Sequence, residues 1–186
     1  MFFSKTLVGA TTFALAASAL PQSSPSSTTS SAASSSSSAS ASGGGSVNII
    51  NNLNETVSIQ STASTTGSSG TKTLNSGGGS YSENWQTTSD GSGISIKMST
   101  GGDSSSVLQF EYTNDGDTLF WDFSSIDLDE SSAFVKGGFS ASADDGSCSS
   151  VSCSAGETNC AESYQNPDDK NTNSCPSGAS FTVTLG

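Results

Sequence analysis

The sequence contains no histidine and no arginine, and its five basic residues, all lysines, stand against 17 aspartates and glutamates. Without histidine there can be no Ser-His-Asp or Cys-His catalytic site and no zinc or copper site built on imidazole. The net charge of −12 excludes nucleic acid and anionic membranes as favourable partners, because phosphate contacts need a basic surface. Any catalysis would have to come from carboxylates, and we expect no cofactor.

Long apolar runs are also missing, apart from a short one at the N-terminus. Residues 1–19 combine Lys5, an apolar stretch over 7–15 and the small-residue pattern Ala17-x-Ala19, which together predict a cleaved secretory signal peptide. That stretch is too short to span a bilayer, and the final SFTVTLG is too short for a lipid-anchor tail. We therefore expect an extracellular protein without a membrane anchor, with the cell wall as one candidate location.

Residues 20–46 contain mostly Ser, Thr, Ala and Gly, and have almost nothing to bury. This composition predicts a disordered linker, and an O-glycosylated stalk is a compatible interpretation. The remaining residues 47–186 have the length of one ordinary domain. Within them, the sequence Asn-Glu-Thr makes Asn54 a candidate N-glycosylation site.

The domain is rich in short segments with the period-two alternation of half-buried strands. One of them, GISIKMS, places Ile94, Ile96 and Met98 on one face and polar residues on the other. The eight strand-containing segments are 46–52, 55–61, 71–87, 93–99, 107–113, 118–124, 133–142 and 180–185. With no amphipathic helix among them, they predict an all-β fold, an antiparallel β-sandwich. Residues 144–174 differ in composition and are interpreted as a cross-linked loop.

Four cysteines, Cys148, Cys153, Cys160 and Cys175, lie near the C-terminus. In a secreted protein an even number favours two disulfides, with three pairings open. A zinc site is the alternative, but the spacing lacks close pairs. The acidic pairs at 144–145 and 168–169 lack the alternation of a calcium loop, so we interpret them as surface charge and predict no metal site.

Several segments follow one another in the order found in a known family. They are SVNIINNLNETVSI, LNSGGGSYSENW, GSGISIKMST, FEYTNDGDTLFWDFSSID and CAESYQNPDDKNTNSCPSGASFTVTL. In this order they resemble the thaumatin-like proteins, over nearly all of 47–186. Details such as GGGSYSE resemble most the small fungal secreted branch that includes the yeast-phase-specific proteins. The resemblance implies a thaumatin-like β-sandwich whose second domain is reduced to a short loop.

The resemblance also implies a pairing of the cysteines, Cys148 with Cys175 and Cys153 with Cys160. A further family disulfide, between the first and last strands, is missing, because Leu53 and Gly186 stand where its two cysteines would be.

An acidic cleft is the site that the resemblance implies. Glu111, Asp122 and Asp127 match three of its acids, Lys97 stands where the family has an arginine, and the remaining aspartate belongs to the missing domain. Carbohydrates bind such groups through their hydroxyls, so the four residues form a candidate carbohydrate-binding cleft. Trp121 is interpreted as a core residue rather than a sugar platform.

A purely structural interpretation is open for some of these acids. Asp115 and Asp117 belong to the turn sequence NDGD, which predicts a hairpin. Asp127, Asp129 and Glu130 can equally be a solvated acidic loop.

Three hypotheses on function follow from the sequence. The favoured one is non-enzymatic binding of cell-wall β-glucan, another wall polysaccharide or a host surface protein through the reduced cleft. The second is a weak endo-β-1,3-glucanase with Glu111 and Asp122 as its acid and base. The third is an antigenic or effector-type interaction protein with a vestigial cleft. We expect a monomer.

Overall fold

The computed structural model describes residues 44–65 and 67–186, so the predicted signal peptide and most of the predicted linker lie outside the described residues. Over these residues the chain forms twelve strands and one short helix. The strands are β1 (Ser46–Asn51), β2 (Val57–Ala63), β3 (Gly67–Ser68), β4 (Lys72–Leu74), β5 (Gly79–Asn84), β6 (Ile94–Thr100), β7 (Leu108–Asp115), β8 (Thr118–Ser124), β9 (Phe139–Ala143), β10 (Val151–Cys153), β11 (Asn173–Pro176) and β12 (Phe181–Leu185), and the helix is α1 (Ala133–Gly137). Within this part of the chain, no helix is long and apolar enough to cross a membrane.

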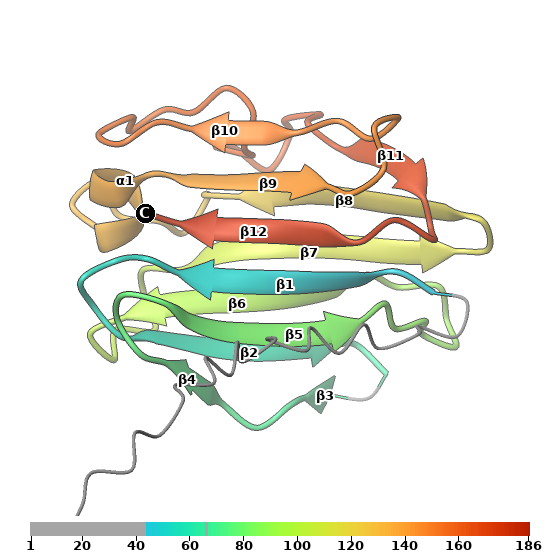
Figure 1. The fold of residues 1–186 in the computed structure, drawn as a ribbon, viewed down its shortest axis with the longest axis horizontal. Coiled ribbons are helices and arrows are strands. Elements are labelled where there is room, and N and C mark those ends of the chain that lie inside the picture. The colour runs from blue at the N-terminus through green and yellow to red at the C-terminus, as the bar shows by residue number, and fades with distance from the viewer. Residues whose placement is uncertain (1–43, 66) are drawn as a thin grey trace, which may run out of the picture. The chain divides into compact units, whose positions relative to one another are not determined.

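The strands form two stacked sheets (Figure 1). The five-stranded sheet has the order β10-β9-β12-β1-β5. The seven-stranded sheet has the order β11-β8-β7-β6-β2-β3, with β4 also paired to β2. Strand pairs are antiparallel except for β1 and β12, which lie parallel and join the two ends of the domain. The all-β sandwich predicted from the sequence is confirmed.

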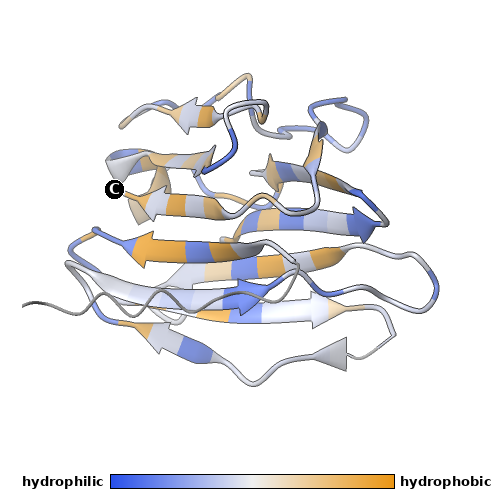
Figure 2. Ribbon diagram, turned by 45° about the vertical axis from the view of Figure 1, so that its right-hand side comes forward, coloured by the Kyte–Doolittle hydropathy of each residue, from blue (hydrophilic) through white to orange (hydrophobic). Residues whose placement is uncertain are grey.

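The core lies between the sheets because most of the longer strands bury alternate residues, as the bands of hydropathy in Figure 2 show. An aromatic cluster fills its centre. Trp121 is fully buried, with its ring centroid 4.7 Å from that of Phe181 and 5.8 Å from that of Phe110. Each such ring contributes about 1.5–3 kcal/mol through burial. Trp121 is therefore a core residue and is not available as a sugar platform.

The outward-facing strand residues of the five-stranded sheet are small and polar apart from Ile50, and none of them is charged. Its residues are Ser46, Asn48, Ile50, Ser80, Ser82, Asn84, Ser140, Ser142, Ser152, Thr182 and Thr184. These residues form rows across the strands. One such row, in which each residue is the register partner of the next, contains Ser152, Ser140, Thr184, Ile50 and Ser80. We call this surface the neutral face.

Residues 133–137 form a helix, whereas the sequence pattern indicated a strand through 133–142. The Ser132 hydroxyl accepts a hydrogen bond from the backbone N–H of Val135 (3.2 Å), which caps the helix N-terminus. Phe134 and Val135 then reach the core from a helical turn. Gly138 ends the helix at φ 80°, and a Cβ there would lie 2.8 Å from the carbonyl oxygen of Cys153.

The region interpreted as a loop, 144–174, also contains regular structure. Its strand β10 pairs with β9 at the edge of the five-stranded sheet, and β11 begins at Asn173 and pairs with β8. These strands are short, with three and four residues, so alternation had too few positions to reveal them.

Two disulfides hold this region, Cys148–Cys175 and Cys153–Cys160, with Cα atoms 5.1 and 5.5 Å apart. This is the pairing that the family resemblance implies. Leu53 and Gly186, which replace the absent cysteine pair, are neighbours: a Cβ built on Gly186 would lie 3.0 Å from Leu53 Cδ2. The buried Leu53 side chain thus takes the place of a cross-link between the first and last strands.

Candidate functional site

The four predicted cleft residues lie on the outward side of the seven-stranded sheet and the loop beside it. Lys97, Glu111 and Asp122 come from the neighbouring strands β6, β7 and β8. Their sequence neighbours point into the core, so the pleat directs all three side chains outward. Asp127 follows β8 and is exposed.

Glu111 and Asp122 are direct cross-strand partners. Side chains in this relation have their Cβ atoms about 4.5–5.5 Å apart, so the two carboxyl groups are neighbours. On the other side of Glu111 lies its register partner Ser95, and Lys97 is paired with Gln109, one outward position along the sheet. The Lys97 side chain is therefore diagonal to Glu111 across the β6–β7 pair, and a whole strand, β7, separates it from Asp122 on β8.

This arrangement shifts the acidity of both carboxyl groups. Burial, and to a smaller extent the charge of Glu111, raise the pKa of Asp122 to about 7. Burial also raises the pKa of Glu111, although the Ser95 hydroxyl and the Lys97 ammonium act in the opposite direction. The pair therefore holds a proton in weakly acidic solution, where ordinary carboxyl groups are ionised.

The two carboxyl groups line a shallow hollow of about 410 Å³. Its other side chains include Thr62, Ser95, Thr113, Phe120 and Thr172. We call this the carboxyl hollow.

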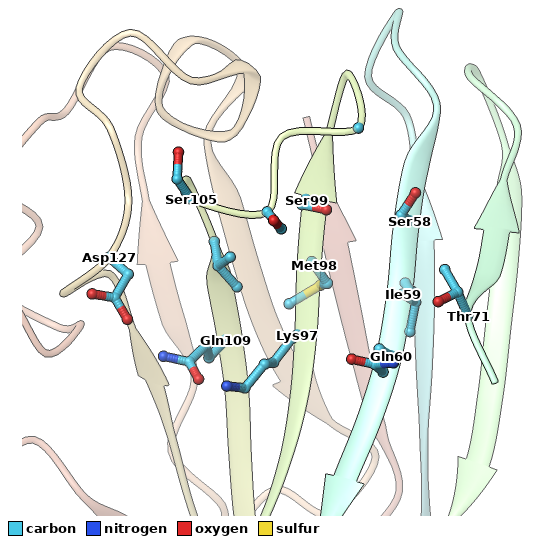
Figure 3. A pocket seen from close by; sticks show the side chains of 13 residues that line it. Ser58, Ile59, Gln60, Thr71, Lys97, Met98, Ser99, Ser105, Gln109 and Asp127 are labelled. Atoms are coloured by element: carbon cyan, nitrogen blue, oxygen red, sulfur yellow. The ribbon is translucent and has the colours of Figure 1, made fainter. Parts of the chain in front are cut away.

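Lys97 and Asp127 line a second hollow, of about 470 Å³. Its wall carries Gln60, Gln109 and several serines, and Figure 3 shows the side chains of Lys97 and Gln109 side by side on neighbouring strands. We call this the lysine hollow. The structure thus brings the four predicted residues onto one surface but divides them between two hollows, which follow each other along β6 and β7.

One residue of this surface was missed from the sequence. The ring of Phe120 is 41% exposed and lies on the wall of the carboxyl hollow. The signal was present: in TLFWDFS, the assignment of Trp121 and Phe123 to the core places Phe120 outward with Asp122.

The other acids singled out in the sequence lie away from the pair. Asp117 is exposed in the β7–β8 turn, and Asp115, at the end of β7, is exposed as well. Asp129 and Glu130 are exposed beyond β8, and Asn54 is exposed between β1 and β2. No group of three or more His, Cys, Asp or Glu side chains in the described part of the chain is arranged to hold a metal ion.

Comparison with known proteins identifies the family. Residues 33–186 match the family described as Blastomyces yeast-phase-specific protein. The chain belongs to this family. It is 47% identical over 140 residues to the "Secreted thaumatin-like protein calA" of Emericella nidulans, covering 75% of this chain and 80% of that protein. It is 40% identical over 107 residues to the "Antigenic thaumatin-like protein" of Arthroderma benhamiae, covering 57% and 53%.

A solved structure has the same fold. The protein elicitor MoHrip2 from Magnaporthe oryzae superposes with a TM-score of 0.62 at 22% identity, over 76% of this chain and 98% of that one. Family, relatives and fold together place the chain in the small fungal branch of thaumatin-like proteins. The relative from Emericella nidulans is named as secreted, which supports an extracellular location for this member of the branch.

Proposed function

We propose that this thaumatin-like protein binds a polysaccharide of the fungal cell wall, with β-1,3-glucan as the ligand, without cleaving it. The observation that carries the proposal is the Glu111–Asp122 pair, two facing carboxyl groups at the surface of the sheet with no cation directly between them. In the described part of the chain, Asp122 accepts no hydrogen bond from another side chain, so its oxygens are available to a ligand.

The shape of the surface favours a chain-like ligand. The outward residues Gln109, Glu111 and Thr113 of β7 cover about 13 Å at the usual rise of a strand, and they connect the two hollows. A polymer can lie along such an open strip, whereas a small molecule would remain mostly in water. Sugar hydroxyls need planar acceptors and donors, and the carboxyl groups and the amides of Gln60 and Gln109 supply them.

Weak hydrolysis is the second candidate function, and the pKa of Asp122 is the observation that favours it. A carboxyl group with a pKa of about 7 can remain protonated near neutral pH, and glycosidases use such a group, beside a second carboxyl group, to protonate a leaving oxygen. On this alternative Asp122 would be the acid and Glu111 the base or nucleophile of an endo-β-1,3-glucanase.

The third candidate is contact with a host protein, in which the hollows have no sugar ligand. One relative is named antigenic and the structural neighbour is described as an elicitor, and these two descriptions are the observations that favour contact with a host protein.

One experiment separates the three. The secreted protein is incubated with insoluble β-1,3-glucan, and both the bound fraction and the reducing ends released are measured in the same tubes. The test variant is Glu111→Gln/Asp122→Asn, which keeps size and hydrogen-bonding capacity but removes the acids. The matched control is Asp115→Asn/Asp117→Asn, which removes two exposed acids of the nearby turn.

Binding by the parent and by the turn variant, with loss in the carboxyl variant and no reducing ends, is the expected result. Reducing ends that disappear in the carboxyl variant would establish the hydrolase. Absence of binding by the parent would refute both sugar hypotheses and leave protein contact as the function of the surface.

A further inference from the structure

Phe120 is exposed although the fold does not require an aromatic residue there. Phe120 and Ile126 are the two large apolar side chains that are exposed in the described part of the chain, at 41% and 39%. The outward neighbours of Phe120 on β8 are Thr118 and Asp122, both polar. A polar residue at position 120 would continue that pattern, and the exposed part of the ring gains nothing from burial.

The ring is bordered by small side chains. Its register partners are Thr113 on β7 and Ser174 on β11, neither of which is large enough to cover a phenyl face. Phe120 is two residues before Asp122 on the same side of β8, so the two side chains are about 6.5–7 Å apart along the strand.

Phe120 also separates two hollows. On one side it lines the carboxyl hollow. On the other it lines a hollow of about 420 Å³ with Thr87, Thr88, Gly91 and Asn114, between the segment that follows β5 and the β7–β8 hairpin. A ligand that lies over the ring therefore has room to continue in both directions, with polar groups on either side.

We propose that Phe120 is the stacking platform of a sugar subsite next to the carboxyl pair, and that it selects β-linked glucopyranose chains. This inference rests on the proposed function and assigns the ligand's position on the surface. One sugar ring lies on the phenyl face, and hydroxyls of the same or the adjoining sugar bond to Asp122 and Glu111.

The selection follows from the shape of the sugar. A β-glucopyranose carries its hydroxyls around the edge of the ring, so that both faces present C–H groups, which pack on an aromatic face by dispersion and burial of apolar area. A sugar with an axial hydroxyl, such as mannose, turns a polar group toward the ring and leaves that hydroxyl without a partner.

The inference is tested with the full secreted protein and the variants Phe120→Ala, Phe120→Trp and Ile126→Ala. Ile126→Ala is the matched control, because it also removes an exposed apolar side chain, but one outside the hollows. Binding to insoluble β-1,3-glucan and to mannan is measured, together with the fluorescence of the Phe120→Trp protein titrated with soluble β-1,3-linked gluco-oligosaccharides. Thermal unfolding of each variant verifies the fold, which an exposed residue should leave intact.

We expect Phe120→Ala to weaken glucan binding at least tenfold, and Phe120→Trp to retain it with a change in fluorescence on titration. Ile126→Ala should bind like the parent, and mannan should bind poorly throughout.

The possible failures differ from one another. If Phe120→Ala binds like the parent while Glu111→Gln/Asp122→Asn does not, the platform is wrong and the proposed function stands. If Ile126→Ala weakens binding as much as Phe120→Ala, the attachment is general hydrophobic adhesion and the platform is refuted. Equal binding to mannan refutes the selection, and absence of parent binding refutes the inference together with the proposed function.

Discussion

Glu83 joins the two sheets through three hydroxyl groups, and its removal gives the sharpest test of how this sandwich is held together. The Glu83 carboxylate, on β5, accepts hydrogen bonds from Tyr81 on the same strand (2.5 Å), Tyr112 on β7 (2.7 Å) and Ser61 on β2 (3.3 Å). Burial, and then the hydrogen bonds to Glu83, raise the pKa of both tyrosines above its ordinary value, so their hydroxyls remain donors at any physiological pH.

Glu83→Ala leaves these donors without their acceptor. Tyr112 is only 2% exposed, so water cannot easily replace the carboxylate there. An unsatisfied buried donor costs about 1–3 kcal/mol, and hydrogen bonds to a charged group contribute about 1.5–3 kcal/mol. Tyr81 is only half-buried, and the bond from the buried Ser61 hydroxyl is long (3.3 Å), so both should add less than Tyr112. We therefore expect a total loss of about 2–4 kcal/mol in the free energy of unfolding, which corresponds to roughly 6–12 °C in Tm for a domain of this size.

The assay is urea or thermal unfolding followed by tryptophan fluorescence, with Glu130→Ala as the control for loss of an exposed acid. Glu83→Gln, which keeps one acceptor oxygen, should cost about half as much. A double-mutant cycle with Tyr112→Phe should show a coupling of about 1 kcal/mol or more. Two results would refute the role of Glu83 in joining the sheets. One is a free energy of unfolding for Glu83→Ala within about 0.5 kcal/mol of that for Glu130→Ala, and the other is additivity of the Glu83 and Tyr112 substitutions in the cycle.

Two further predictions concern pH and the disulfides. The raised pKa of Asp122 means that the folded state holds its proton more firmly than the unfolded chain, so this residue favours folding at pH below about 4 and loses that contribution as the pH rises through about 7. A rise of about three pKa units corresponds to about 4 kcal/mol, so Asp122→Asn should be more stable than the parent by up to about 4 kcal/mol at pH 8 and nearly equal to it at pH 3.5. Equal stability differences at the two pH values in urea titrations would contradict this. Replacing Cys148 and Cys175 by serine should lower the free energy of unfolding by about 3–4 kcal/mol, against about 2–3 for Cys153 and Cys160, because the first disulfide, with a separation of 27 residues against 7, closes the longer loop. The reverse order of the two losses in calorimetry would count against the loop-length argument.

Alternation in the sequence was sufficient to predict most of the sandwich, because strands such as β6 and β7 bury every second residue over seven or eight positions. It failed where the elements are short. The apolar pair Phe134 and Val135 fits either a strand or a single helical turn, and only the Ser132 cap and the crowding at Gly138 decide between them.

The candidate site, too, could be predicted only in part from the sequence. The strand pattern placed Glu111 and Asp122 on facing arms of a hairpin, and their register as direct partners depends on the two-residue turn at 116–117. The division between two hollows could not be predicted, because Asp127 lies in a loop whose position depends on tertiary contacts such as the hydrogen bond from the backbone N–H of Val107 to the Asp127 carbonyl oxygen (2.8 Å).

The neutral face has a consequence for how the molecule would approach a charged boundary. The chain has a net charge of −12, and the outward-facing strand residues of the neutral face include no charged one. The electric field of the protein is therefore uneven, and it is stronger over the opposite sheet and the loops. Charges act on one another with little screening over roughly 8 Å in physiological salt. Within that distance of an anionic surface, repulsion would turn the molecule so that the neutral face is directed toward the surface. The carboxyl hollow, on the opposite sheet, would then be directed away from the anionic surface and would remain accessible to a ligand on that side.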